Sequence, residues 1–156
     1  MSEFVRSRNS YDGKKDAKRL YPDLPEPLEI GTYDNHTHLE IEDTDFPMGI
    51  QDHLAKMLQV NMLGAVQVGV TLESSKYSAE IAKSEPMVLA AVAIHPNEAP
   101  LYGSLSSLNA AIDEIAELAK QPRVRAIGET GLDYFRTDGA DALALQHHSF
   151  ERHIEI

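Results

Sequence analysis

The chain has 156 residues, which fits one domain with a hydrophobic core, and its 42% hydrophobic and 25% charged residues are typical of a soluble globular protein. It carries a net charge of −11, no apolar run long enough to cross a membrane and no signal-peptide pattern. The absence of cysteine excludes disulfides and thiolate metal sites, so we expect a reducing location, the cytoplasm, and any metal ligands must be His, Asp or Glu.

The charge is unevenly distributed along the chain. Residues 1–20 carry six basic and three acidic side chains, and the remainder carries 8 basic and 22 acidic ones. We expect residues 1–29, polar and then interrupted by prolines, to form a partly disordered arm, with contact to a phosphate backbone as the alternative to a solvated tail. An acidic body disfavours a broad electrostatic groove for nucleic acid, although bound divalent cations can supply local positive charge.

Strand and helix signals alternate from Ile30 onward. The predicted strands are Ile30–Leu39, Ala65–Val70, Val88–Ile94 and Val124–Thr130. The first predicted helix contains Ile50, Leu54, Met57 and Leu58, which recur at helical spacing. The other predicted helices are Ser74–Lys83, Leu108–Ala119 and Ala142–Ile156. Four consecutive βα units predict an α/β fold with a parallel sheet and right-handed crossovers. The chain has no glycine-rich phosphate-binding loop, which disfavours nucleotide-binding folds.

The first predicted strand ends in the segment YDNHTHLE. Alternation along a strand puts Asp34, His36 and His38 on one face, and two imidazoles beside a carboxylate are typical of a metal site. The alternative is that both histidines serve only as hydrogen-bonding groups at the strand end.

Two further polar clusters follow the third and fourth predicted strands. His95 lies in AIHPNEAP, and Glu129 and Asp133 lie in GETGLDYF. The carboxyl ends of parallel barrel strands form one rim, so we expect these clusters to meet the histidine pair there. His95 can instead be structural, and Glu129 can instead pair with Arg123 or Arg125.

Together these segments resemble the TatD family of metal-dependent deoxyribonucleases, which are TIM-barrel hydrolases. The family pattern D-x-H-x-H-L-D reads here from Asp34 to Glu40, with Glu in the last place, and G-x-H-P reads from Ala93 to Pro96. The pattern E-x-G-L-D-Y is intact from Glu129 to Tyr134, and the fourth helix resembles the family's glutamine- and phenylalanine-bearing helix. The resemblance covers residues 30–156.

The resemblance implies a (β/α)8 barrel of which residues 30–156 hold about the first four βα units. It implies that His36 and His38 ligate metal, that Glu129 bridges two divalent ions and serves catalysis, and that His95 faces the substrate phosphate. The implied activity is two-metal hydrolysis of phosphodiester bonds in DNA, with Mg, Mn, Zn or Fe as the metal.

The family's remaining ligands would follow Ile156, so we expect weak activity or none from this chain alone. We expect one of three alternatives. The chain is a fragment of a longer protein, a half-barrel that self-associates through its open edges, or an aggregation-prone remnant. The rival functions are a non-catalytic metal-binding or self-associating module, a phosphoesterase of the polymerase-and-histidinol-phosphatase type, and a barrel hydrolase acting on small amides or lactones. His147, His148 and His153 are expected to be solvated positions on the fourth helix.

Overall fold

The computed structural model describes residues 21–41 and 48–156. Most of the predicted arm, residues 1–29, lies outside this part of the chain, including the basic side chains of residues 1–20. The described end of the arm, residues 21–29, has no regular secondary structure. It is attached to the fold at Leu28, whose N–H donates to the Val60 carbonyl and whose carbonyl accepts from the Asn61 side chain.

Four strands alternate with four α-helices in the described residues. The strands are β1 (Thr32–Thr37), β2 (Met62–Val68), β3 (Val88–Val92) and β4 (Val124–Ile127), and the helices are α1 (Ile50–Gln59), α2 (Leu72–Ser84), α3 (Leu105–Ala119) and α4 (Ala140–Glu155). A short 3-10 helix, η1 (Ala99–Tyr102), follows β3. All eight main elements were predicted from the sequence, and η1 was not.

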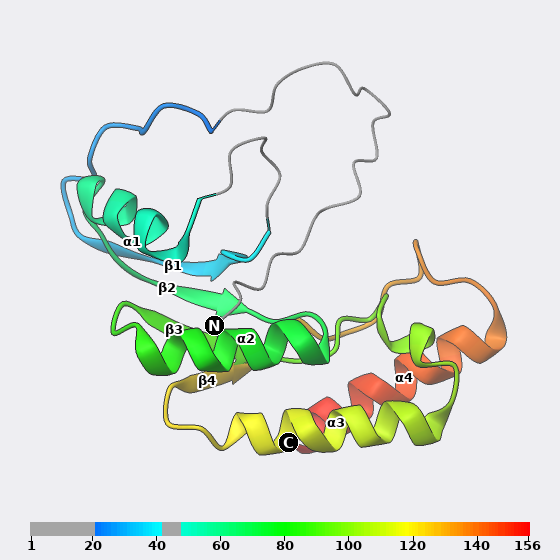
Figure 1. Cartoon of the computed structure of the whole chain (residues 1–156). Coiled ribbons are helices and arrows are strands. Elements are labelled where there is room, and N and C mark those ends of the chain that lie inside the picture. The colour runs from blue at the N-terminus through cyan, green and yellow to red at the C-terminus, as the bar shows by residue number, and fades with distance from the viewer. Residues whose placement is uncertain (1–20, 42–47) are drawn as a thin grey trace.

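The strands form one parallel sheet in the order β1-β2-β3-β4. In Figure 1 all four strands point toward the same end of the molecule, and α3 and α4 lie side by side, as their contacts also show. The βα connections therefore deliver every segment that follows a strand to one rim. This arrangement confirms the predicted α/β fold, with four strands of a barrel wall and β1 and β4 at its edges.

The hydrophobic core lies between the sheet and the helices α2 and α3. Alternate residues of β3, Val88, Ala90 and Val92, are fully buried against Leu108 and Ile112 of α3. The run VLAAVAI is therefore apolar because both faces of β3 are covered, as expected for a central parallel strand. Leu58, which we placed on the apolar side of the first helix, is exposed, and Leu54 is the buried residue of α1.

The start of α2 is built from small residues. Thr71 and Ser74 form a capping box, in which the Thr71 hydroxyl accepts from the Ser74 N–H and Ser74 Oγ accepts from the Thr71 N–H. Gly69 allows this turn to approach the sheet, since a Cβ atom there would lie 2.4 Å from Ser75 Oγ and 2.5 Å from Ser75 Cα. No helix of the described residues is both long and apolar enough for a membrane span.

Candidate metal centre

The ends of β1 and β4 meet at the rim through three side chains. His36 Nε2 lies 3.3 Å from His38 Nε2, and Glu129 Oε2 lies 3.6 Å from the first and 3.7 Å from the second. In a flat sheet the two outer strands of four would be about 14 Å apart, so a contact across the sheet requires strong curvature. The curvature of the wall thus creates the cluster.

His95 approaches the same carboxylate from β3. Its Nε2 lies 3.9 Å from Glu129 Oε1, the oxygen that is not directed at His36 and His38. The two carboxylate oxygens therefore face different partners. The side chains of Glu129 and His95 remain partly open to solvent, with exposed fractions of 39% and 25%.

The hydrogen bonds of His38 and His95 give their rings opposite roles. The Val68 carbonyl can only accept, so His38 Nδ1–H donates to it (2.9 Å) and, in the neutral ring, Nε2 keeps its lone pair for a metal. The Asn97 N–H can only donate, so His95 Nδ1 accepts it (3.1 Å) and, in the neutral ring, Nε2 carries the proton. His38 Nε2 therefore keeps a lone pair that could bind a metal, whereas His95 Nε2–H can donate a hydrogen bond.

Burial lowers the pKa of His38, and the nearby carboxylates of Glu40 and Glu129 partly oppose this. Glu40, the last residue of the first motif, is buried and accepts from the Gln67 side-chain amide, whose oxygen accepts the Leu39 N–H. Glu40 therefore holds the Gln67 side chain, which in turn fixes the backbone just after His38.

The donor set fits a divalent ion. Ligand atoms about 2.0–2.2 Å from a tetrahedral metal lie about 3.3–3.6 Å from one another, close to the separations between His36, His38 and Glu129. These three residues form the group of metal-ligating side chains that the described part of the chain brings together. A ligand set of two imidazoles and one carboxylate suits Zn, Mn or Fe. A set of oxygen ligands alone would suit these metals less well.

Asp34 and Asp133, the other acids of the motifs, are used by the backbone. Asp34 Oδ1 accepts the His36 N–H (2.9 Å), so it does not join the ligand group as the strand alternation predicted. Asp133 Oδ1 accepts two backbone N–H groups, those of Phe135 and Arg136, and its Oδ2 accepts from the Asn97 side chain (3.0 Å). The Asn97 hydrogen bond is the largest of the causes that lower the pKa of Asp133 to about 2.

The alternative pairing of Glu129 with Arg123 or Arg125 does not occur. Arg123 donates to the carbonyls of Pro86 and Val88, and Arg125 donates to that of Val124.

The histidines of α4 were predicted to be solvated, and this is wrong for His153. His147 is exposed and bonds to the Tyr134 hydroxyl, whereas His148 is half-buried against Asn109 of α3. His153 is buried among core residues. It follows Leu145 and Ser149 at intervals of four, so it shares their buried face, and that spacing was the available signal.

Sequence reasoning also missed Gln146, which lies behind the rim. This fully buried amide accepts the Asp133 N–H (2.8 Å) and donates to the Pro96 carbonyl (3.1 Å) and to the Thr137 hydroxyl (2.7 Å). It thus joins the loop that follows β3 to the loop that follows β4. A polar residue on the apolar face of an amphipathic helix was the signal.

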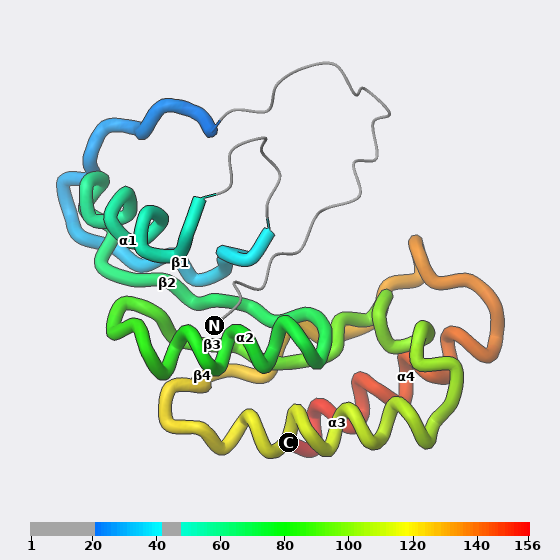
Figure 2. The backbone as a smooth tube through the Cα atoms, viewed as in Figure 1, coloured from blue at the N-terminus to red at the C-terminus, as the bar shows by residue number. Residues whose placement is uncertain are grey.

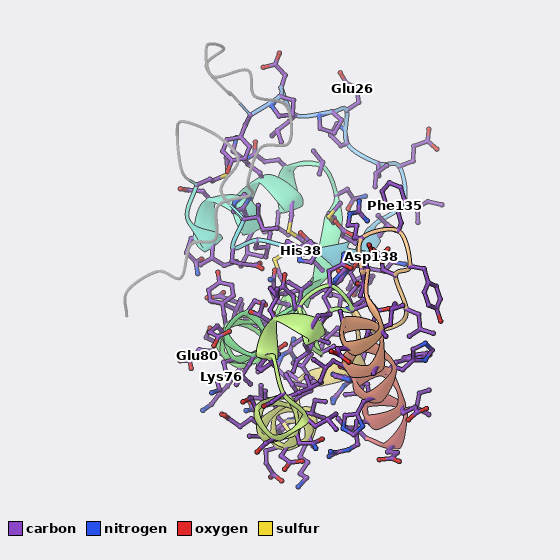
Figure 3. The ribbon with its side chains drawn as sticks, turned by 90° about the vertical axis from the view of Figure 1, so that its right-hand side faces the viewer. Glu26, His38, Lys76, Glu80, Phe135 and Asp138 are labelled. Atoms are coloured by element: carbon purple, nitrogen blue, oxygen red, sulfur yellow. The ribbon has the colours of Figure 1, made fainter. Side chains whose placement is uncertain are left out.

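The rim also carries an exposed loop after β4. Figure 3, viewed from the end to which the strands point, shows Phe135 and Asp138 on this loop. The Phe135 side chain is 91% exposed, and the Arg136 guanidinium lies 5.6 Å from the centre of its ring.

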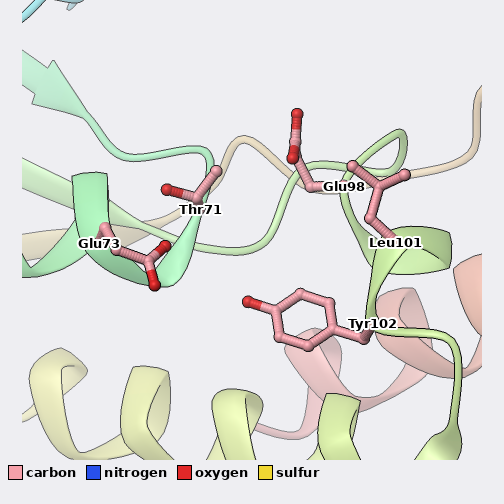
Figure 4. Close-up of a pocket in the computed structure, with 5 residues that line it drawn as sticks. All are labelled: Thr71, Glu73, Glu98, Leu101 and Tyr102. Atoms are coloured by element: carbon pink, nitrogen blue, oxygen red, sulfur yellow. The ribbon is translucent and has the colours of Figure 1, made fainter.

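A separate pocket of about 250 Å³ lies between the start of α2 and η1, lined by Thr71, Glu73, Glu98, Leu101 and Tyr102 (Figure 4). Burial and then the charge of Glu73 raise the pKa of Tyr102, so its hydroxyl stays protonated at neutral pH. The two carboxylates beside a neutral phenol give this pocket negative charge, which disfavours anionic ligands there.

Comparison with known proteins assigns the chain to a family of this barrel class. The family model described as TatD related DNase matches residues 33–156, and the chain therefore belongs to that family.

Two relatives and one solved structure illustrate the likeness. The chain is 31% identical over 126 residues to an uncharacterized metal-dependent hydrolase TatD of Mycobacterium tuberculosis, covering 79% of this chain and 46% of that protein. It is 26% identical over 98 residues to a protein of Salmonella typhimurium named 3'-5' ssDNA/RNA exonuclease TatD, covering 63% and 36%. The crystal structure of YJJV, a TatD homologue from Escherichia coli K12, has a TM-score of 0.59 and 22% identity, covering 81% and 46%. The chain thus spans less than half the length of these proteins.

Proposed function

We propose that this chain carries one part of a two-metal phosphodiesterase site that acts on DNA. The observation that carries the proposal is the convergence of His36, His38 and Glu129 from the two edge strands. The relative named as a 3'-5' ssDNA/RNA exonuclease supports a nucleic-acid substrate. The cytoplasmic location stays a prediction.

In this proposal His36 and His38 would hold one divalent ion, and Glu129 would bridge it to a second ion. The division of that carboxylate between His36 and His38 on one side and His95 on the other supports a bridging role. Bound divalent ions would lower the pKa of a water molecule and neutralise charge on the phosphodiester.

The protein's own groups orient the reactants. The Val68 carbonyl fixes the ring of His38 so that Nε2 faces the rim. His95, whose Nδ1 is occupied by the Asn97 N–H, presents Nε2–H as a donor to a non-bridging phosphate oxygen. Because three ligands form an incomplete coordination shell, we expect weak hydrolysis from this chain by itself.

Titration of the chain with Zn²⁺ and Mn²⁺ by calorimetry tests the ligand set. We expect His36→Ala and Glu129→Ala each to weaken the first binding event by at least about tenfold, since each removes one side chain that would bind the metal. His147→Ala and Glu80→Ala are matched controls, since both residues are exposed and distant in sequence from the cluster. Equal affinity in all four variants would refute the ligand assignment.

Hydrolysis assays then separate the substrate classes. With saturating metal, we expect end-labelled single-stranded DNA and bis(p-nitrophenyl) phosphate to be cleaved slowly, and small amides and lactones not at all. Preference for an amide or lactone would replace the nuclease proposal with the small-molecule hydrolase.

A self-associating half-barrel is the second candidate, and the open edge of the sheet favours it. In the described residues β1 and β4 each pair on one side only, and a pocket of about 290 Å³ lies along β4, lined by Ala119, Val124, Arg125, Ala126, Ile127 and Ile156. Pairing of β4 with β1 of a second copy would close an eight-stranded wall. Light scattering after size-exclusion chromatography would give a dimer mass if this is right and a monomer mass if it is wrong.

A further inference from the structure

Strand β3 ends before the chain reaches His95. The last residue of β3 is Val92, so residues 93–96 depend on other elements for their backbone hydrogen bonds. Ala93 and Ile94 are fully buried, where an unpaired N–H or carbonyl is costly. How this short segment is held determines where His95 lies.

Side chains of two helices and the backbone just after β2 hold it. Ser75 of α2 bonds to both the N–H and the carbonyl of Ala93 through its hydroxyl, at 3.1 and 2.9 Å. The His95 N–H donates to the Val70 carbonyl (2.8 Å). The His95 carbonyl accepts the N–H groups of Glu98 and Ala99. Two further bonds come from α4, which Figure 2 shows running back from the rim beside α3.

His153 and Gln146 of α4 bracket His95. His153 Nε2 accepts the N–H of Ile94, the residue before it (3.1 Å), and Gln146 Nε2–H donates to the carbonyl of Pro96, the residue after it (3.1 Å). A single tautomer of His153 satisfies both ring nitrogens, because Nδ1–H donates to the Ser149 carbonyl (2.6 Å). Burial lowers the pKa of His153, which keeps the ring neutral and able to accept.

We infer that His153 and Gln146 are positioning residues that fix His95 against Glu129, and that α4 thereby sets the geometry of the rim. Neither side chain touches the ligand cluster in the described structure. The effect on His95 is independent of the proposed function, and only its consequence for phosphate binding rests on that function.

NMR of the ¹⁵N-labelled chain tests the role of His153 without requiring activity. His153→Phe keeps a buried ring but removes the acceptor, and we expect the Ile94 amide to exchange with solvent about ten- to hundredfold faster. The imidazole ¹⁵N signals of His95 should shift, since its Nδ1 contact with Asn97 loosens. His153→Gln, whose amide oxygen takes the place of Nε2, should restore both signals.

The controls separate local repositioning from general unfolding. The amides of Ala90 and Val92, inside the ladder, should keep their wild-type exchange in His153→Phe, and His148→Gln on the same helix should change nothing at Ile94. Unchanged Ile94 and His95 signals in His153→Phe, or failure of His153→Gln to restore them, would overturn the inference. If His153→Phe does not fold, His153→Asn, which is too short to reach Ile94, replaces it with the same two outcomes.

Zinc titration of the same samples distinguishes this inference from the proposed function. His153→Phe should bind Zn²⁺ as the wild type does, because the ligands lie at the ends of β1 and β4. If the wild-type chain does not bind Zn²⁺, the metal proposal is refuted and the positioning role is unaffected.

Discussion

Replacing Gln146 by leucine should destabilise the protein more than a change in the partly exposed cluster of His36, His38 and Glu129. Gln146 is fully buried and makes hydrogen bonds to the Asp133 N–H, the Pro96 carbonyl and the Thr137 hydroxyl. Leucine has a similar volume, so the substitution removes the bonds and leaves little cavity. Each net bond contributes about 1 kcal/mol, and each buried group left unpaired costs about 1–3 kcal/mol.

The expected loss is therefore about 3–5 kcal/mol in the free energy of unfolding, reduced in part by the more apolar side chain. With a urea dependence of about 2 kcal/mol per molar, the unfolding midpoint should fall by about 1.5–2.5 M. Circular dichroism at increasing urea concentration measures this midpoint directly.

Glu129→Gln, assayed without metal, is the matched control. The Glu129 side chain is 39% exposed and lies 3.6 Å or more from its histidine partners, so the free energy of unfolding should change by less than about 0.5 kcal/mol. A midpoint for Gln146→Leu within about 0.5 M of wild type, or an equal fall in both variants, would refute the view that the polar bonds behind the rim stabilise it.

Two further predictions concern Asp133, in the loop after β4, and Gly69, in the turn before α2. Because the pKa of Asp133 is about 2 in the fold against an ordinary 3.8, its contribution to stability should be complete above about pH 5 and lost as the pH falls toward 2. Thermal midpoints of wild type and Asp133→Asn should therefore converge over that range, and a constant difference would contradict the assignment. Gly69→Ala should cost about 1–3 kcal/mol, because the new Cβ atom would lie 2.5 Å from Ser75 Cα, a backbone atom that cannot move aside cheaply. A wild-type urea midpoint for this variant would show that α2 can retreat from the sheet.

The alternation of strands and helices could be predicted because each element carries its own periodicity. The apolar run of β3 and the helical spacing in α3 fix where these elements lie without reference to the rest of the chain. The strand ends could not be predicted as well. We extended the third strand to Ile94 and the fourth to Thr130, whereas their ladders end at Val92 and Ile127. Residue type does not reveal that Ser75 and His153 replace the ladder partners.

The site was predictable to the extent that its residues lie in short motifs. His36 lies in β1 and His38 directly follows the strand, and the parallel order brings the end of β4 to the same rim. The hydrogen bonds behind the rim join residues that are distant in sequence. Gln146 and Pro96 are 50 positions apart, and His153 and Ile94 are 59 positions apart. No local pattern encodes such pairs, although the spacing of Leu145, Ser149 and His153 along α4 could have indicated that His153 is buried.

These two layers of the rim have different physical origins, and this makes them separable. The ligand cluster depends on the curvature of the sheet, because only a curled wall brings the end of β1 within 3.6 Å of Glu129. The backbone on either side of His95 depends in addition on α4, since its groups bond to His153 and Gln146, whereas the His95 N–H itself bonds to the Val70 carbonyl. A change in α4 should therefore move the donor while leaving the ligands in place.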